Sequence, residues 1–193
     1  MVAASPLALT PEIQHFRKQF EQLSADANAL VAPLTDDQFN WHPAPGAWSI
    51  AQCIDHLNVT ARMYLPMLDE GIADAIRRGL YAEGPFRYNL INRIVARSME
   101  PPYWVRTKTP KAFQPPPNRP RHDVMAAFHA YQVQYIDRLR QANGLDLARA
   151  TAASPVLTWL RFQLGTAFAF TTAHERRHLW QARRITEHSE FPN

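Results

Sequence analysis

Apolar residues recur at helical spacing along four long stretches of this chain, and no stretch alternates apolar and polar residues as a half-buried strand does. The stretches cover residues 11–32, 49–78 and 121–142, with a last one that begins between Ser154 and Thr158 and ends near 188. Each places an apolar stripe along one side of a helix. The chain has 193 residues, enough to bury these stripes in one core. The sequence therefore predicts an all-α fold, a single helical domain over residues 1–193.

Local signals mark where the first two helices begin. Thr10 and Pro11 supply an N-cap and a proline at the first helical position. Ser49 and Gln52 have the S-x-x-Q form of a capping box. The last helix has a weaker start, and Gly165 within it costs about 1 kcal/mol relative to alanine. Close packing or a bend is therefore expected at this glycine.

Residues 79–120 differ in character, because eight of the sixteen prolines fall among them. Arg87 to Arg97 could form a short helix, and the remainder should be extended or irregular. Several aromatic residues argue against disorder. We interpret this segment as a long crossover packed on the helices. An ordinary packed crossover is the preferred interpretation, and the alternative is that Tyr103, Trp104 and Phe113 cover a site beneath it.

Two histidines interrupt the apolar stripe of the last helix. His174 and His178 are four residues apart, so their imidazoles lie on one helix face and could chelate one metal ion. Because a catalytic zinc usually has three protein ligands, a third ligand is expected from another helix. His56 is the best candidate, since it lies in a helix with polar residues around it, and His129 is the alternative.

The run from His174 to His178 also matches H-E-x-x-H, the zinc metalloprotease pattern. We do not adopt that interpretation, because only fifteen residues follow His178 and the extended form of the motif is missing. Glu175 points about a quarter-turn from the histidines. A surface pair with an arginine is its expected role, and a role as a base remains open. The other histidines are expected at the surface; they are His15, His42, His122 and His188.

Composition narrows the possible partners and locations. The net charge is +4, but the basic residues are dispersed among acids without a recognisable binding motif, so no nucleic-acid partner is predicted. No apolar run approaches the roughly 18–20 residues that span a bilayer. The start of the chain lacks the pattern of a signal peptide, which predicts a cytoplasmic location. The one cysteine, Cys53, excludes an internal disulfide and a multi-cysteine zinc site, and it is expected to be buried.

Two motifs together resemble those of the DinB-like superfamily, the DinB/YfiT-like metalloenzymes. They are Asn40-Trp41-His42-Pro43-Ala44-Pro45-Gly46-Ala47-Trp48-Ser49-Ile50 followed by Asp55-His56-Leu57, and the closing His174-x-x-x-His178-Leu179-x-Gln181. The resemblance implies a four-helix bundle with a long crossover between the second and third helices. It also implies a divalent metal held by His56, His174 and His178, and a homodimer. The Pro-rich segment 79–120 departs from the family, so the substrate pocket cannot be inferred by analogy.

Three imidazoles best suit zinc or nickel, with iron or manganese as alternatives, and they leave an open position on the metal. Such a metal lowers the pKa of a bound water or thiol. Two activities fit: hydrolysis of an amide or ester, and transfer of a low-molecular-weight thiol to a small-molecule substrate. Asp55, Tyr64, Glu175 and Gln181 are candidate pocket groups. A non-catalytic metal-binding or damage-response module that acts through a partner is the alternative, and a bundle without metal is a third hypothesis.

Overall fold

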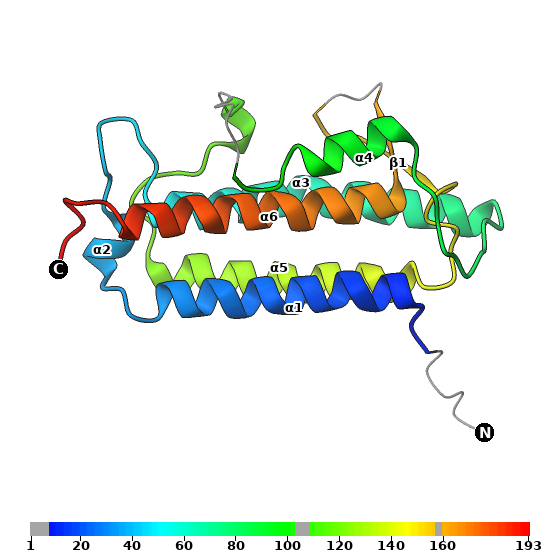
Figure 1. Ribbon diagram of the computed structural model, residues 1–193, viewed down its shortest axis with the longest axis horizontal. Coiled ribbons are helices and arrows are strands. Elements are labelled where there is room, and N and C mark those ends of the chain that lie inside the picture. The colour runs from blue at the N-terminus through cyan, green and yellow to red at the C-terminus, as the bar shows by residue number, and fades with distance from the viewer. Residues whose placement is uncertain (1–7, 103–108, 157–159) are drawn as a thin grey trace.

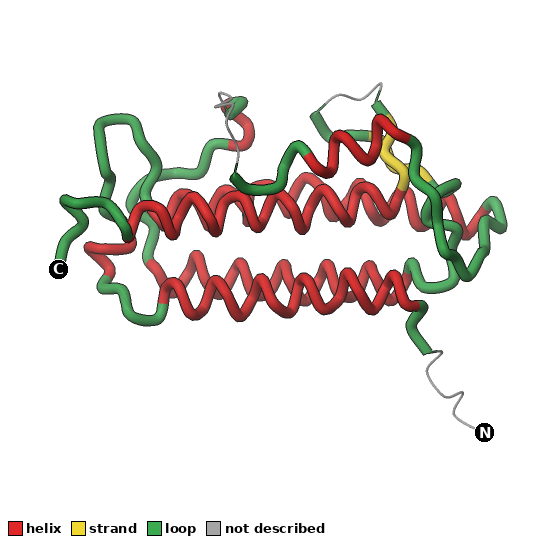
Figure 2. Tube along the Cα trace, viewed as in Figure 1, coloured by secondary structure: helices red, strands yellow, loops and turns green. Residues whose placement is uncertain are grey.

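The computed structural model describes residues 8–102, 109–156 and 160–193, and these are mainly helical, as predicted (Figures 1 and 2). The elements in chain order are α1 (Pro11–Val31), α2 (Asp36–Asn40), α3 (Ile50–Arg77), α4 (Leu90–Arg97), the 3₁₀ turn η1 (Lys111–Phe113), α5 (Arg121–Gln141), β1 (Thr151–Ala153), β2 (Arg161–Gln163) and α6 (Leu164–Thr186). The ends of α1, α3 and α5 agree with the predicted ends to within about two residues. No helix among the described residues is long and apolar enough to cross a membrane.

Four long helices form the bundle. Figure 1 shows α3 and α6 in one layer and α1 and α5 in the other. Both α3 and α1 pack on α5 and on α6, so consecutive long helices α1 and α3 occupy opposite corners. The helices α3 and α5 are neighbours that run in the same direction (Figure 1). The chain between them must therefore return along the whole bundle, and it does so past α4, which packs on α6.

The core is made from the apolar stripes of the four helices. Phe16 and Phe20 of α1 are buried, and the Phe20 ring stacks on Tyr135 of α5 with ring centroids 5.0 Å apart. The helix α3 is buried on more than one side because it contacts both α5 and α6. Cys53 lies on this helix and is fully buried with a free thiol, as predicted. A polar side chain that α3 directs toward α6 is therefore shielded from bulk water.

The capping signals are confirmed in part. The hydroxyl of Ser49 accepts from the backbone N–H of Gln52, and the Gln52 side chain accepts from the backbone N–H of Ser49. Thr10 occupies the N-cap position of α1, but its hydroxyl makes no capping bond. The short helix α2 was not predicted. Its own capping box, formed by Thr35 and Gln38, is the sequence signal that could have revealed it.

The predicted start of the last helix is wrong. Residues 151–153 and 161–163 form two antiparallel strands, with Ala152 opposite Phe162, and α6 begins only at Leu164. Thr158 lies outside the described residues. The prediction failed because strands of three residues are too short to show an alternating pattern. Tertiary packing favours the hairpin here, since β1 lies against α3 at Gly71, where a Cβ would come within 2.9 Å of the Ala152 Cβ.

Two features predicted around the crossover have structural counterparts. The short helix α4 falls inside the predicted range 87–97. Gly165 marks close packing, because an added Cβ would collide with the Tyr88 ring. Phe113 is buried in η1, whereas Tyr103 and Trp104 lie outside the described residues. The crossover thus contacts α6 through Tyr88 and α4, and it contacts α3 through η1.

Candidate metal centre

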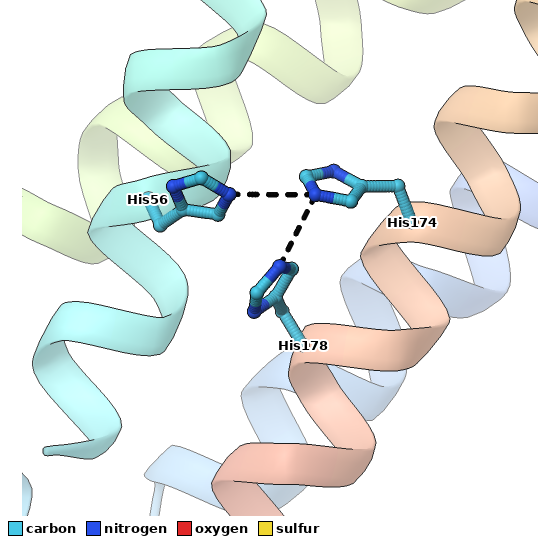
Figure 3. A group of neighbouring side chains, drawn as sticks. All are labelled: His56, His174 and His178. Atoms are coloured by element: carbon cyan, nitrogen blue, oxygen red, sulfur yellow. Dashed lines mark hydrogen bonds between the residues drawn. The ribbon is translucent and has the colours of Figure 1, made fainter. Parts of the chain in front are cut away.

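The structure brings together the three histidines that the sequence singled out. His56 comes from α3, and His174 and His178 come from successive turns of α6 (Figure 3). The Nε2 atom of His174 lies 3.4 Å from Nε2 of His56 and 3.1 Å from Nε2 of His178. One ligand atom from each ring lies within 4.8 Å of the other two. The three Nε2 atoms therefore converge on one point between α3 and α6.

The spacing of these atoms fits one metal ion. Metal–nitrogen bonds of about 2.0–2.1 Å at tetrahedral angles separate the nitrogens by roughly 3.3 Å. The two Nε2 separations, 3.4 and 3.1 Å, lie on either side of that value. Within the described residues, no fourth histidine, cysteine or carboxylate joins the group. A divalent ion held there would retain an open coordination position.

His56 is oriented by the crossover. Its Nδ1 lies 2.7 Å from the backbone carbonyl oxygen of Phe113. A carbonyl oxygen only accepts, so Nδ1 must carry the ring proton that is donated in this bond. That bond leaves a lone pair on Nε2, the atom that faces the other two rings. Sequence reasoning missed this contact, because a backbone carbonyl has no signature in the sequence. The crossover thus sets the tautomer of a candidate ligand.

Burial keeps all three rings neutral. Loss of solvent lowers the pKa of His56, and the bond to Phe113 opposes that shift. Burial, with help from the charges of His56 and Arg177, lowers the pKa of His174 to about 3. Burial also holds the pKa of His178 well below its usual value, and the charges of His174, His56 and Arg177 add to the effect. Neutral imidazole is the form that binds a metal, so the site is prepared to bind one at neutral pH.

Glu175 lies in the bundle interior, and its predicted surface pairing is wrong. Its side chain is only 3% exposed, and Nε2 of Gln132 on α5 donates to its two oxygens at 3.1 and 3.0 Å. Burial raises the pKa of Glu175 to about 8. The carboxyl group thus points from α6 into the middle of the bundle, where it meets the Gln132 side chain of α5. Glu175 is also not among the residues that line the histidine pocket, so the structure does not place it as a base there.

The remaining candidates divide into pocket residues and interior residues. Tyr64 and Gln181 line the pocket, whereas Asp55 is buried in the bundle and accepts a hydrogen bond from Asn58. His129 bonds to Asn28 of α1, which sets it apart from the cluster. The histidines predicted at the surface are exposed; they are His15, His42, His122 and His188.

A cavity of about 930 Å³ opens over the three histidines. Aromatic rings form part of its wall and hold the imidazoles. The Trp48 ring lies 5.1 Å from the His56 ring and 5.8 Å from the His178 ring, centroid to centroid. Phe170 stacks on His174 at 5.9 Å. A volume of this size accommodates a small organic molecule.

Comparisons with known proteins identify the family of the chain and support its fold. The family model of the DinB superfamily matches residues 19–182. The solved structure of YfiT from Bacillus subtilis, a probable metal-dependent hydrolase with an unusual four-helix bundle topology, superposes with a TM-score of 0.61. The match covers 98% of this chain and 95% of that chain at 13% sequence identity, so it speaks for the fold. No curated protein sequence matches the chain significantly.

Proposed function

The chain belongs to the DinB superfamily, and from this premise we propose that it is a metal-dependent enzyme of the hydrolase type. In this proposal His56, His174 and His178 hold one divalent metal ion. The observation that carries it is the convergence of three imidazole Nε2 atoms, from two buried histidines and one half-buried histidine, at separations that suit a single ion. Zinc or nickel is the expected metal, since three imidazoles suit both ions.

The metal would act as a Lewis acid that polarises a substrate carbonyl and lowers the pKa of a bound water or thiol. The residues of the chain supply position and shielding. Phe113 orients His56 through its carbonyl, so the crossover of residues 79–120 belongs to the site in this proposal. Trp48 and Phe170 hold the rings and make the wall apolar. Burial raises the pKa of Tyr64 to about 12, so its phenol stays protonated and can donate to a substrate oxygen.

The open pocket favours catalysis over a purely structural metal. A structural zinc is usually closed by four protein ligands, whereas the described residues offer three beneath a cavity of about 930 Å³. The expected substrate is therefore a small molecule. The homodimer, the cytoplasmic location and the single domain over 1–193 stay predictions from the sequence.

The test is metal analysis of the purified protein and of three variants, H56A, H174A and H178A. We expect about one zinc or nickel per chain in the wild type and at least a tenfold loss of affinity in each variant. H122A, which removes an exposed histidine, is the matched control and should keep the metal. Metal affinity equal to that of the wild type in any of the three variants contradicts the proposed ligand set.

Activity is then measured with the metal-loaded protein on panels of esters, amides and thiol–electrophile pairs. Turnover of an ester or amide that disappears in H178A supports the hydrolase. Turnover that requires an added thiol identifies a transferase at the same site. A bound metal without turnover on any panel would favour the non-catalytic alternative.

A further inference from the structure

The short helix α4 presents its apolar residues to solvent, the reverse of an ordinary surface helix. Leu90, Ile91 and Ile94 are 68%, 68% and 57% exposed, whereas the polar side chain of Asn92 is buried at 6%. A surface helix usually buries its apolar stripe and exposes its polar residues. The three aliphatic side chains lie within about 100° of the helix circumference, so they form one outward side. We call these three residues the apolar face of α4.

Polar contacts fix α4 in this orientation. The side-chain oxygen of Asn92 accepts from the backbone N–H of Gln163 at 3.2 Å, and the backbone N–H of Asn89 donates to the Gln163 side chain at 3.0 Å. The Asn89 side chain also caps α4, since it accepts from the backbone N–H of Asn92 at 2.9 Å. Figure 1 shows α4 outside the four-helix bundle, next to α6, on which it packs. The exposure of the apolar face therefore follows from specific anchoring of the opposite side.

Positive charge accompanies the apolar face. Residues 84–99 contain no acidic residue. Their three basic residues are exposed and form no ion pair among the described residues; they are Arg87, Arg93 and Arg97. Of the two flanking acids, Glu100 pairs with Arg176, which leaves Glu83. Arg93 and Arg97 are one turn apart on α4, on the strip of helix surface next to Leu90. The exposed side of α4 is thus both aliphatic and cationic.

We propose that α4 binds the surface of an anionic lipid bilayer, with its apolar face among the acyl chains and its arginines at the headgroups. A helix with an aliphatic side and flanking basic residues is suited to this interface. It lies in the plane of the membrane surface, so it needs no apolar run long enough to cross the bilayer. The inference goes beyond the proposed metal-dependent function and does not depend on the metal.

A second copy of the chain fits this surface less well. A two-fold interface places the same surface patch on both partners. The arginines of one α4 would then lie close to those of the other, and like charges repel. A bilayer with acidic headgroups has the opposite charge and a fluid apolar layer beneath it. Charge complementarity therefore favours the lipid surface.

The test is cosedimentation of the full chain with lipid vesicles, with chelator present so that the metal site plays no part. We expect the wild type to bind vesicles with about one-third phosphatidylglycerol at least about tenfold more tightly than pure phosphatidylcholine vesicles. The preference should weaken as salt is added. R93Q/R97Q should lose most of it. K18Q/R140Q, which removes the same charge from exposed positions on α1 and α5, should retain it.

A second pair of variants tests the apolar face. I91Q/I94Q should lower the affinity for the anionic vesicles by at least about tenfold, because two aliphatic side chains no longer enter the bilayer. V133Q, which changes a 58% exposed valine of α5, is the matched control and should bind as the wild type does. Circular dichroism of each variant confirms that the fold is intact.

Several results would overturn the inference. They include no binding to the anionic vesicles, equal binding to both kinds of vesicle, and equal losses in R93Q/R97Q and K18Q/R140Q. A dimer in analytical ultracentrifugation that I91Q/I94Q converts to a monomer would assign the apolar face to a second copy instead. Polyglutamate that binds the wild type where vesicles do not would assign the arginines to an acidic polypeptide. None of these results bears on the metal centre, which is tested separately by metal analysis.

Discussion

Replacing Glu175 by glutamine should make the protein more stable, and by more at pH 8.5 than at pH 5. Burial raises the pKa of this carboxyl from 4.5 to about 8, so the folded state holds a proton that the unfolded state releases near 4.5. The protonated carboxyl group therefore makes its full contribution to the free energy of unfolding below pH 4.5. That contribution is lost as the pH rises from 4.5 to about 8. Glutamine has the same shape and no such titration.

The magnitude follows from the pKa shift. A rise of the pKa from 4.5 to about 8, at about 1.4 kcal/mol for each tenfold change in the proton-binding constant, sets an upper value of about 5 kcal/mol for the loss of stability. The neighbouring Gln132 should further stabilise the E175Q variant. Its side-chain oxygen is buried and has no hydrogen-bond partner among the described residues, so the new amide can donate to it. We expect the advantage of E175Q to grow by at least about 2 kcal/mol from pH 5 to pH 8.5.

The assay is urea unfolding of wild type and E175Q at both pH values, with chelator present throughout. The buried histidines titrate in the opposite sense, because lowered pKa values cost stability at low pH. That effect is common to both proteins and cancels in their difference. A difference that stays the same at pH 5 and pH 8.5 would refute the reasoning, since it would mean that Glu175 is ionised in the folded protein at both.

Two further substitutions test the packing and the capping. G71A should destabilise the protein by about 1 kcal/mol or more in urea unfolding, because the added Cβ would lie 2.8 Å from Leu164 Cδ1 and 2.9 Å from Ala152 Cβ. A gain in stability, as helix propensity alone predicts, would contradict this close approach. S49A should cost about 1 kcal/mol by removing the acceptor for the Gln52 N–H, and S49D should restore most of it. Equal stability of S49A and wild type would show that the cap contributes little.

Much of the fold could be read from local patterns. The stripe of α1, the capping box of Ser49 and the start of α5 all depend on residues close together in the chain, and the structure agrees with them. The i, i+4 spacing of His174 and His178 likewise places both rings on one face of α6 wherever that helix packs. The polar residues around His56 on its helix favoured it as the third ligand. The sequence pattern alone did not exclude His129 from that role.

Contacts between distant segments decided the rest. The hairpin before α6 forms because β1 packs on α3 at Gly71. A strand of three residues is too short for its sequence pattern to predict it. Glu175 is interior because its side of α6 faces the middle of the bundle, where Gln132 of α5 donates to it. The orientation of His56 depends on a backbone carbonyl 57 residues away, at Phe113, which every residue type possesses. Side-chain periodicity specifies which face of a helix is apolar, whereas which neighbour covers that face is a property of the packed chain.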